Sequence, residues 1–173
     1  MTESIIKEGK VDISVAELTY TKNGLIIAHE LNPYTIYKIK IREESIKNPL
    51  LIPKKKEFSF ETEPNTFREI NIPFYEAGEV SGKVIRKIPQ KDIPIAGLKV
   101  QIINILTEES NAISTFSDGT FYYFGLLPGK YKLVLNKEQL SAINATLESN
   151  EFFFEISNAQ KDKVNNFDII IRN

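Results

Sequence analysis

The sequence predicts an all-β protein built from two tandem small antiparallel β-sandwiches. Three observations lead to this prediction: short runs of alternating apolar and polar residues, turn dipeptides between those runs, and only one short stretch with helical features. The chain has 173 residues, enough for one large or two small domains. The strand series is best divided at Glu76-Ala77-Gly78, so we predict domains over residues 1–75 and 79–173.

The first domain begins with a strand carrying Val11 and Ile13, followed by a hairpin. Asn23-Gly24 is the hairpin dipeptide, because both residues tolerate the positive φ that tight turns require. A further strand places Tyr37, Ile39 and Ile41 on one face, with lysines on the other. Two more short strands are expected, with these alternating apolar residues: Phe58 and Phe60; Ile70, Ile72 and Phe74.

Residues 43–56 contain two prolines and end in Lys54-Lys55-Lys56, so we expect a long loop there. The lysine run is typical of a solvated loop.

The second domain is predicted to have seven strands, about right for a small sandwich. The strands are expected at residues 80–88, 99–106, 112–116, 121–124, 131–135, 152–156 and 167–171. Residues 89–94 are expected to form a turn-rich loop. The one helical turn is predicted over residues 137–142, with Asn136 as its N-cap.

Two tyrosines are predicted to be buried where their strands begin. Leu31-x-Pro33 precedes Tyr37, and Leu126-x-Pro128 precedes Tyr131. A tyrosine in such a position closes a corner of the chain when its hydroxyl bonds to nearby backbone. We interpret both as structural corners without a further role.

Four short motifs of the second half resemble the carboxypeptidase regulatory-like domain, a transthyretin-like β-sandwich, over about residues 79–173. They are Gly82-x-Val84, Gly97-x-x-Val100, Asp118-Gly119-x-Phe121 and Leu127-Pro128-Gly129-x-Tyr131. Gly119 supplies positive φ in a turn, and Pro128-Gly129 delivers Tyr131 to its strand. The first 75 residues resemble, more distantly, a small and possibly incomplete immunoglobulin or fibronectin type III-like sandwich, through the approach to Tyr37.

The resemblance also raises the question of a covalent cross-link. Related collagen-adhesin B-type domains can carry a Lys–Asn isopeptide bond that is assisted by an acid. This chain offers Lys83 with Asn166 or Asn173. The strand over residues 131–135 lacks the glutamate that the resemblance calls for, so we expect no cross-link.

The run Phe121-Tyr122-Tyr123-Phe124 yields the one candidate binding surface. If Asp118-Gly119 is a two-residue hairpin loop, Phe116 lies opposite Phe121 and Ile113 lies opposite Phe124. The core face is then expected to hold Phe116, Phe121 and Tyr123. The opposite face is expected to hold an apolar stripe of Ile113, Thr115, Tyr122 and Phe124.

An exposed stripe of this kind can stack on sugar rings or dock another protein. Packing against a neighbouring strand or domain is the plainer interpretation.

Composition excludes several kinds of chemistry. The absence of cysteine excludes disulfides and thiolate sites, and His29 is the only histidine. No nucleophile elbow, phosphate-binding glycine loop or calcium-loop spacing is present. We therefore expect no catalytic residues, metal or cofactor. A formal charge of -1 gives no electrostatic footprint for nucleic acid.

The ends of the sequence carry two expectations. Met1 to Ser4 do not begin a signal peptide, and no apolar run is long enough to cross a membrane. The chain ends just after an apolar strand, which suits the end of a domain.

These observations predict a non-catalytic structural, adhesive or spacer module of a larger bacterial surface or secreted protein. Its partners are then the neighbouring domains of a parent chain, together with a glycan or a cell-surface protein, and its location is extracytoplasmic. Two alternatives stay open. One is a carbohydrate-binding module that uses the strand aromatics. The other is an accessory domain that stabilises an attached enzyme, as the resemblance to the carboxypeptidase regulatory-like domain implies.

Overall fold

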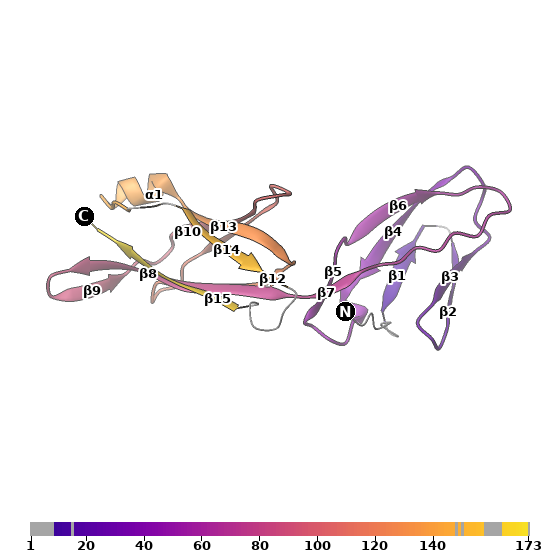
Figure 1. Cartoon of the computed structure of the whole chain (residues 1–173), viewed down its shortest axis with the longest axis horizontal. Helices are drawn as coiled ribbons and strands as arrows, with labels where there is room; N and C mark the ends of the chain where they lie inside the picture. The colour runs from indigo at the N-terminus through magenta and orange to yellow at the C-terminus, as the bar shows by residue number, and fades with distance from the viewer. Residues whose placement is uncertain (1–8, 15, 148, 150, 158–163, 173) are drawn as a thin grey trace. The chain divides into compact units, whose positions relative to one another are not determined.

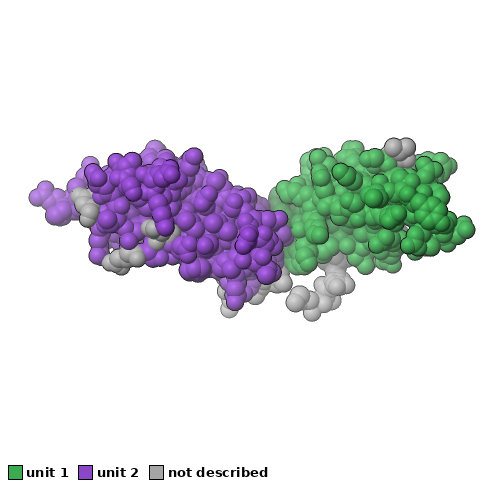
Figure 2. Space-filling model, turned by 90° about the horizontal axis from the view of Figure 1, so that it is seen from above, with its two compact units in different colours: residues 1–75 green, residues 76–173 purple. Residues whose placement is uncertain are grey.

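The computed structural model describes residues 9–14, 16–147, 149, 151–157 and 164–172. Strands dominate, so the protein is all-β (Figure 1). The chain divides into two compact units, residues 1–75 and 76–173, coloured green and purple in Figure 2. No helix among the described residues reaches the length and apolar character that a membrane crossing requires.

Unit 1 contains one three-stranded sheet, in the order β1-β4-β6, and two strand pairs, β2-β3 and β5-β7. Its elements are β1 (Lys10–Ile13), β2 (Glu17–Tyr20), β3 (Ile26–His29), β4 (Ile36–Arg42), the 3₁₀ turn η1 (Glu43–Ser45), β5 (Leu51–Pro53), β6 (Glu57–Glu61) and β7 (Phe74–Glu76). The alternation predicted for β4 is confirmed, since Tyr37, Ile39 and Ile41 are buried and the residues between them are exposed. Ile39 and Ile41 of this inward face pack on Val11 and Ile46 to form the small core of the unit.

Two predictions for unit 1 are wrong. The loop predicted over residues 43–56 contains η1 and β5, and it buries Ile46. The strand predicted around Ile70, Ile72 and Phe74 exists only from Phe74. Ile70 and Ile72 still pack against the core, so their alternation reports burial without a hydrogen-bonded partner strand.

Unit 2 is a two-layer sandwich. One sheet has the order β11-β10-β13-β14, and the other has the order β12-β8-β15, with β9 also paired to β8. Its elements are β8 (Gly78–Ile88), β9 (Lys91–Pro94), β10 (Lys99–Asn104), β11 (Ser110–Ser114), β12 (Thr120–Leu126), β13 (Gly129–Leu135), α1 (Lys137–Ala142), β14 (Glu151–Ile156) and β15 (Val164–Ile171).

Both sheets of unit 2 contribute to one core. Val84, Phe121 and Ile169 come from the β8 sheet, while Ile102 and Leu133 come from the β10 sheet. Each of these side chains is at most 1% exposed. This shared apolar layer makes the unit a sandwich, with one face of each sheet turned toward the core.

The strand count and strand directions of unit 2 correct the prediction. The described residues of unit 2 form eight strands in place of the expected seven, because β9 forms in the segment predicted to be a loop. All four of its residues are exposed, so no burial pattern marks it in the sequence. The unit is also not purely antiparallel, since β15 runs parallel to β8.

The predicted helix is confirmed over Lys137–Ala142. The Asn136 side chain accepts a hydrogen bond from the Gln139 N–H at 2.8 Å, as an N-cap does.

Candidate functional site

The turn at Asp118-Gly119 forms, but it does not join two paired strands. The Gly119 N–H donates to the Phe116 carbonyl at 3.0 Å, and Gly119 has a φ of 79°. Thr120 donates to the Asp118 carboxylate from its hydroxyl at 2.7 Å and from its N–H at 3.0 Å. These bonds hold the pKa of Asp118 below its ordinary value. The strands on either side belong to different sheets, since β11 pairs with β10 and β12 with β8.

The predicted hairpin register is therefore wrong. Phe116, expected in the core, is 59% exposed, while Thr115, expected outside, is 5% exposed. The Thr115 hydroxyl donates to the Ile95 carbonyl at 2.6 Å and accepts from the Leu98 N–H at 2.9 Å, which holds this end of β11 beside β10. Ile113, expected in the surface stripe, is half-buried and packs against the core of unit 2.

The predicted stripe is therefore not assembled as one surface. On β12, Phe121 is buried and Tyr123 packs on the core, while Tyr122 is 50% exposed and Phe124 is half-buried. Ile113 lies on β11, in the other sheet. Only the β12 residues remain as a candidate contact surface.

Polar groups from β8 and β15 lie beside the Tyr122 ring. Tyr122 is the register partner of Ser81, which in turn is the partner of Asn166. The Tyr122 hydroxyl donates to the Glu79 carboxylate at 2.6 Å, and this bond raises the pKa of Tyr122. The Ser81 hydroxyl is 3.1 Å from the Asn166 amide oxygen. We call Tyr122, Glu79, Ser81 and Asn166 the Tyr122 strip.

The geometry of the cross-link candidates does not favour amide formation. Lys83 and Asn166 lie on adjacent strands, but both are exposed on the outer face of the sheet. Lysine nucleophiles are activated by desolvation in an apolar pocket, which these exposed positions do not provide. Asn173 lies outside the described residues.

Both predicted corner tyrosines are buried and hydrogen-bonded to backbone. Tyr37 is 4% exposed, and its hydroxyl accepts from the Asn32 N–H at 2.9 Å. Tyr131 is 5% exposed, and its hydroxyl donates to the Leu127 carbonyl at 2.8 Å. Burial raises the pKa of Tyr131. Pro128 precedes β13, which begins at Gly129, so this corner delivers Tyr131 into its strand.

The Asn23-Gly24 turn connects β2 and β3. Gly24 has a φ of 89°, and the Thr21 N–H donates to the Leu25 carbonyl at 2.9 Å. His29 lies on β3 with its ring nitrogen 3.1 Å from the Thr19 hydroxyl, and it is exposed. Within the described residues, no group of three or more histidine or acidic side chains is placed to hold a metal ion.

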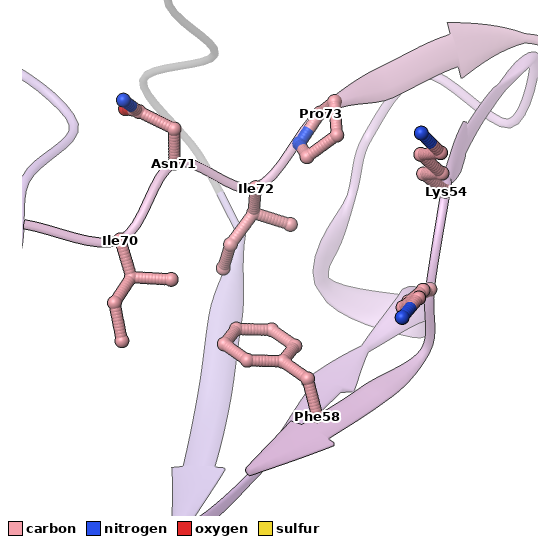
Figure 3. Close-up of a pocket in the computed structure, with 7 residues that line it drawn as sticks. Lys54, Phe58, Ile70, Asn71, Ile72 and Pro73 are labelled. Atoms are coloured by element: carbon pink, nitrogen blue, oxygen red, sulfur yellow. The ribbon is translucent and has the colours of Figure 1, made fainter. Parts of the chain in front are cut away.

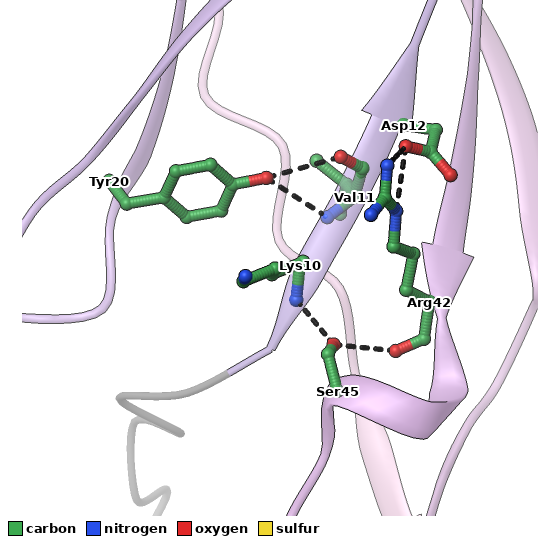
Figure 4. A network of polar contacts seen from close by, with 6 residues as sticks. All are labelled: Lys10, Val11, Asp12, Tyr20, Arg42 and Ser45. Carbon is green, nitrogen blue, oxygen red and sulfur yellow. Dashed lines mark hydrogen bonds and ion pairs between the residues drawn. The ribbon is translucent and has the colours of Figure 1, made fainter.

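A polar network ties β1 to its neighbours in unit 1 (Figure 4). The Tyr20 hydroxyl contacts the backbone N–H and carbonyl of Val11 at 3.4 and 3.2 Å. Arg42 pairs with Asp12 through its Nε at 2.7 Å, which lowers the pKa of Asp12. The Lys10 N–H donates to the Ser45 hydroxyl at 2.6 Å. These contacts position the edge strand, and nothing in them indicates catalysis.

Unit 1 also contains a shallow pocket that the sequence did not predict (Figure 3). Its volume is about 120 Å³, and its lining residues are Lys54, Lys55, Phe58, Ile70, Asn71, Ile72 and Pro73. The only sequence signal is the alternation of Ile70 and Ile72, which predicted a strand. The pocket forms because residues 70–73 lie at a distance from β6. Local sequence patterns do not predict that distance.

Comparison with known proteins gives a structural likeness only. No family model and no curated protein matches the chain. Among solved structures, the minor pilin GBS52 of Streptococcus agalactiae is 16% identical with a TM-score of 0.45, covering 88% of this chain and 66% of its own. The Bacillus anthracis TIE protein is 13% identical with a TM-score of 0.45, covering 98% of this chain and 31% of its own.

The major pilin subunit BcpA of Bacillus cereus is 10% identical with a TM-score of 0.41, covering 98% of this chain and 56% of its own. The chain thus spans between about a third and two thirds of these structures. At TM-scores below 0.5, the likeness assigns no family to this chain.

Proposed function

We propose that this chain is a non-catalytic, load-bearing spacer module within a larger bacterial surface or secreted protein. One observation carries the proposal: β8 and β15, the first and last strands of unit 2, lie side by side and run parallel. Their register extends from Glu79 opposite Val164 to Arg86 opposite Ile171. The chain therefore enters unit 2 at one end of this ladder and leaves it at the other.

This arrangement suits a unit that is pulled through both of its ends. Tension applied at the start of β8 and the end of β15 acts along the strands, so the ladder bonds share the load and have to break together. In a hairpin pulled open from one end, the bonds break one after another. Buried Val84, Ile169 and Ile171 fasten the same two strands to the core. A spacer in a surface protein needs this resistance to tension.

The proposal also assigns a domain class to each unit and a location to the protein. For unit 2, a carboxypeptidase regulatory-like domain is supported by the two-layer sandwich, the Gly119 turn and the Pro128-Gly129 corner. For unit 1, an immunoglobulin-like domain is supported by the Tyr37 corner. An extracytoplasmic location and attachment to neighbouring domains follow from the spacer role.

Single-molecule stretching between the two chain termini tests the load-bearing role. We expect two unfolding events, because each unit has its own core. The event with the longer extension, from unit 2, should need the higher force. Among the described residues of unit 1, the first strand β1 pairs with β4 and the last strand β7 pairs with β5, so no ladder joins β1 to β7. If the event with the longer extension, which is the unfolding of unit 2, occurred at the lower force, the proposal would be contradicted.

Moving one attachment point provides the matched control. Glu138 is exposed on α1, which precedes β15 in the chain. Pulling through a cysteine at this position takes the load off the β8–β15 ladder. The unfolding force of unit 2 should then fall, although its composition is almost unchanged.

A second candidate function is glycan binding by the Tyr122 strip. The ring of Tyr122 is half exposed, and Glu79, Ser81 and Asn166 offer a carboxylate, a hydroxyl and an amide beside it. An aromatic face next to such groups suits a sugar ring. On a glycan array, binding that disappears with Tyr122→Ala and survives Phe153→Ala would support this function. Phe153 is an exposed aromatic on β14, in the other sheet. The absence of any bound glycan would exclude it.

A further inference from the structure

The segment over residues 67–73 has the side-chain pattern of a strand without a partner. Ile70 and Ile72 point toward Phe58 and the core, while Asn71 points the other way (Figure 3). The backbone N–H and carbonyl groups of residues 69–72 make no hydrogen bond with the described part of the chain. At the end of the segment, the Pro73 carbonyl accepts from the Lys54 N–H at 2.9 Å. An unpaired backbone edge of this kind is a template for pairing with another strand.

The pocket lies directly against this edge. Phe58, Ile70, Ile72 and Pro73 supply its apolar walls, and its volume is about 120 Å³. A protein cavity of about 150 Å³ holds a benzene molecule, so this pocket suits one branched aliphatic side chain. Phe67, at the start of the segment, is 100% exposed and offers a further apolar contact.

The charges around the pocket select the chemistry of an occupant. Lys54 and Lys55 line it, and neither forms an ion pair with the described residues, whereas Lys56 pairs with Glu43 at 2.9 Å. On the segment itself Arg68 and Glu69 carry opposite charges, and no carboxylate is among the residues that line the pocket. The local excess of positive charge favours an acidic partner.

We propose that residues 67–73 dock an extended acidic peptide segment of a partner protein. The peptide adds as a strand to the open backbone edge, which is a common mode of peptide recognition. One aliphatic side chain fills the pocket, and neighbouring carboxylates lie against Lys54 and Lys55. The site is in unit 1 and does not depend on the load-bearing role of unit 2.

The first test uses the full chain and a defined peptide. The probe is an acetylated, amidated peptide, Thr-Glu-Thr-Leu-Thr-Glu-Thr, titrated into isotope-labelled protein and followed by amide chemical shifts. We expect the shifts to concentrate at Lys54, Lys55 and residues 69–72, and to weaken as salt is added. A peptide with lysine in place of glutamate, or alanine in place of leucine, should bind more weakly. Shifts elsewhere, or equal binding of the three peptides, would overturn the proposal.

Two sets of variants separate docking from folding. The double variant Lys54→Glu, Lys55→Glu changes only exposed side chains and should weaken binding about tenfold. Asn71→Pro removes one backbone N–H, whereas Asn71→Ala retains it, so only the proline variant should lose binding. If the proline variant does not fold, the Lys54→Glu, Lys55→Glu variant and the comparison of the three peptides still test the proposal. Unchanged affinity in the lysine variant would refute the site.

One further outcome concerns a second copy of this chain. Chemical shifts at residues 69–72 that change with protein concentration, without any peptide, would show that the edge pairs with another copy. That result would also refute a docking site for an acidic partner.

Discussion

Replacing Gly82 with alanine is expected to destabilise unit 2 by about 3 kcal/mol. A Cβ at this position would collide with the Phe121 ring and with the backbone carbonyl of Phe167. Phe121 is 1% exposed and cannot move out of the packed core, and the Phe167 carbonyl belongs to the neighbouring strand β15. Relief of the collision therefore has to move β8 away from β15. Gly82 belongs to one of the four motifs singled out in the second half of the sequence, and this close approach is the physical reason for a glycine at this position.

Amide hydrogen exchange measures this effect separately in each unit. The protection of the β8 and β15 amides should fall strongly in the Gly82→Ala variant, while the protection of the β4 amides should stay unchanged. Ser81→Ala is the control, because it alters the neighbouring residue on the outer face and should change stability by less than about 0.5 kcal/mol. Undiminished protection in β8 would show that the core accommodates the added methyl group.

A disulfide between positions 83 and 168 is expected to stabilise unit 2 by about 4.5 kcal/mol in the chain-entropy account. Lys83 and Asp168 are direct register partners on β8 and β15, and both side chains are exposed on the outer face. Neighbouring strands bring such partners within the Cα separation that a disulfide spans. The chain has no cysteine of its own, so Lys83→Cys, Asp168→Cys offers only one pairing. The cross-link closes a loop over most of unit 2, which removes much entropy from the unfolded chain.

Chemical denaturation of the oxidised and reduced forms measures the stabilisation. The stretching experiment gives a second readout, because the oxidised protein should lose most of the longer extension, and a reductant should restore it. Failure of the two cysteines to pair would contradict the parallel register of β8 and β15. It would also remove the observation on which the load-bearing role depends.

Much of the local structure follows from the sequence alone. The exposed and buried residues of β4 alternate as the pattern of Tyr37, Ile39 and Ile41 predicts. The N-cap of α1 and the positive φ of Gly119 are likewise determined by the residue type at one position. Each of these depends on a few neighbouring residues, namely a period of two, a side-chain oxygen near free N–H groups, or the lack of a Cβ. For this reason the all-β class could be predicted.

Strand pairing was decided by the tertiary structure. The Asp118-Gly119 turn has the same local chemistry whether it closes a hairpin or carries the chain between two sheets. The hydrogen bonds of Thr115 to Ile95 and Leu98 hold β11 in the β10 sheet, and these partners lie far away in the sequence. Because β11 pairs with β10, Phe116 is exposed and Ile113 packs against the core. The residues of the predicted stripe therefore do not form one surface.

The two features that carry the proposals also depend on long-range packing. Alternation in β15 and β8 predicts two strands, but it does not predict that they lie side by side in parallel. Alternation at Ile70 and Ile72 correctly reports burial, yet the backbone there has no partner strand and leaves a pocket beside Phe58. Alternation predicts which side chains of a strand are buried, and this prediction needs only the sequence of that strand. The partner of each backbone edge is determined by how all the apolar faces pack together, and only the folded chain contains that information.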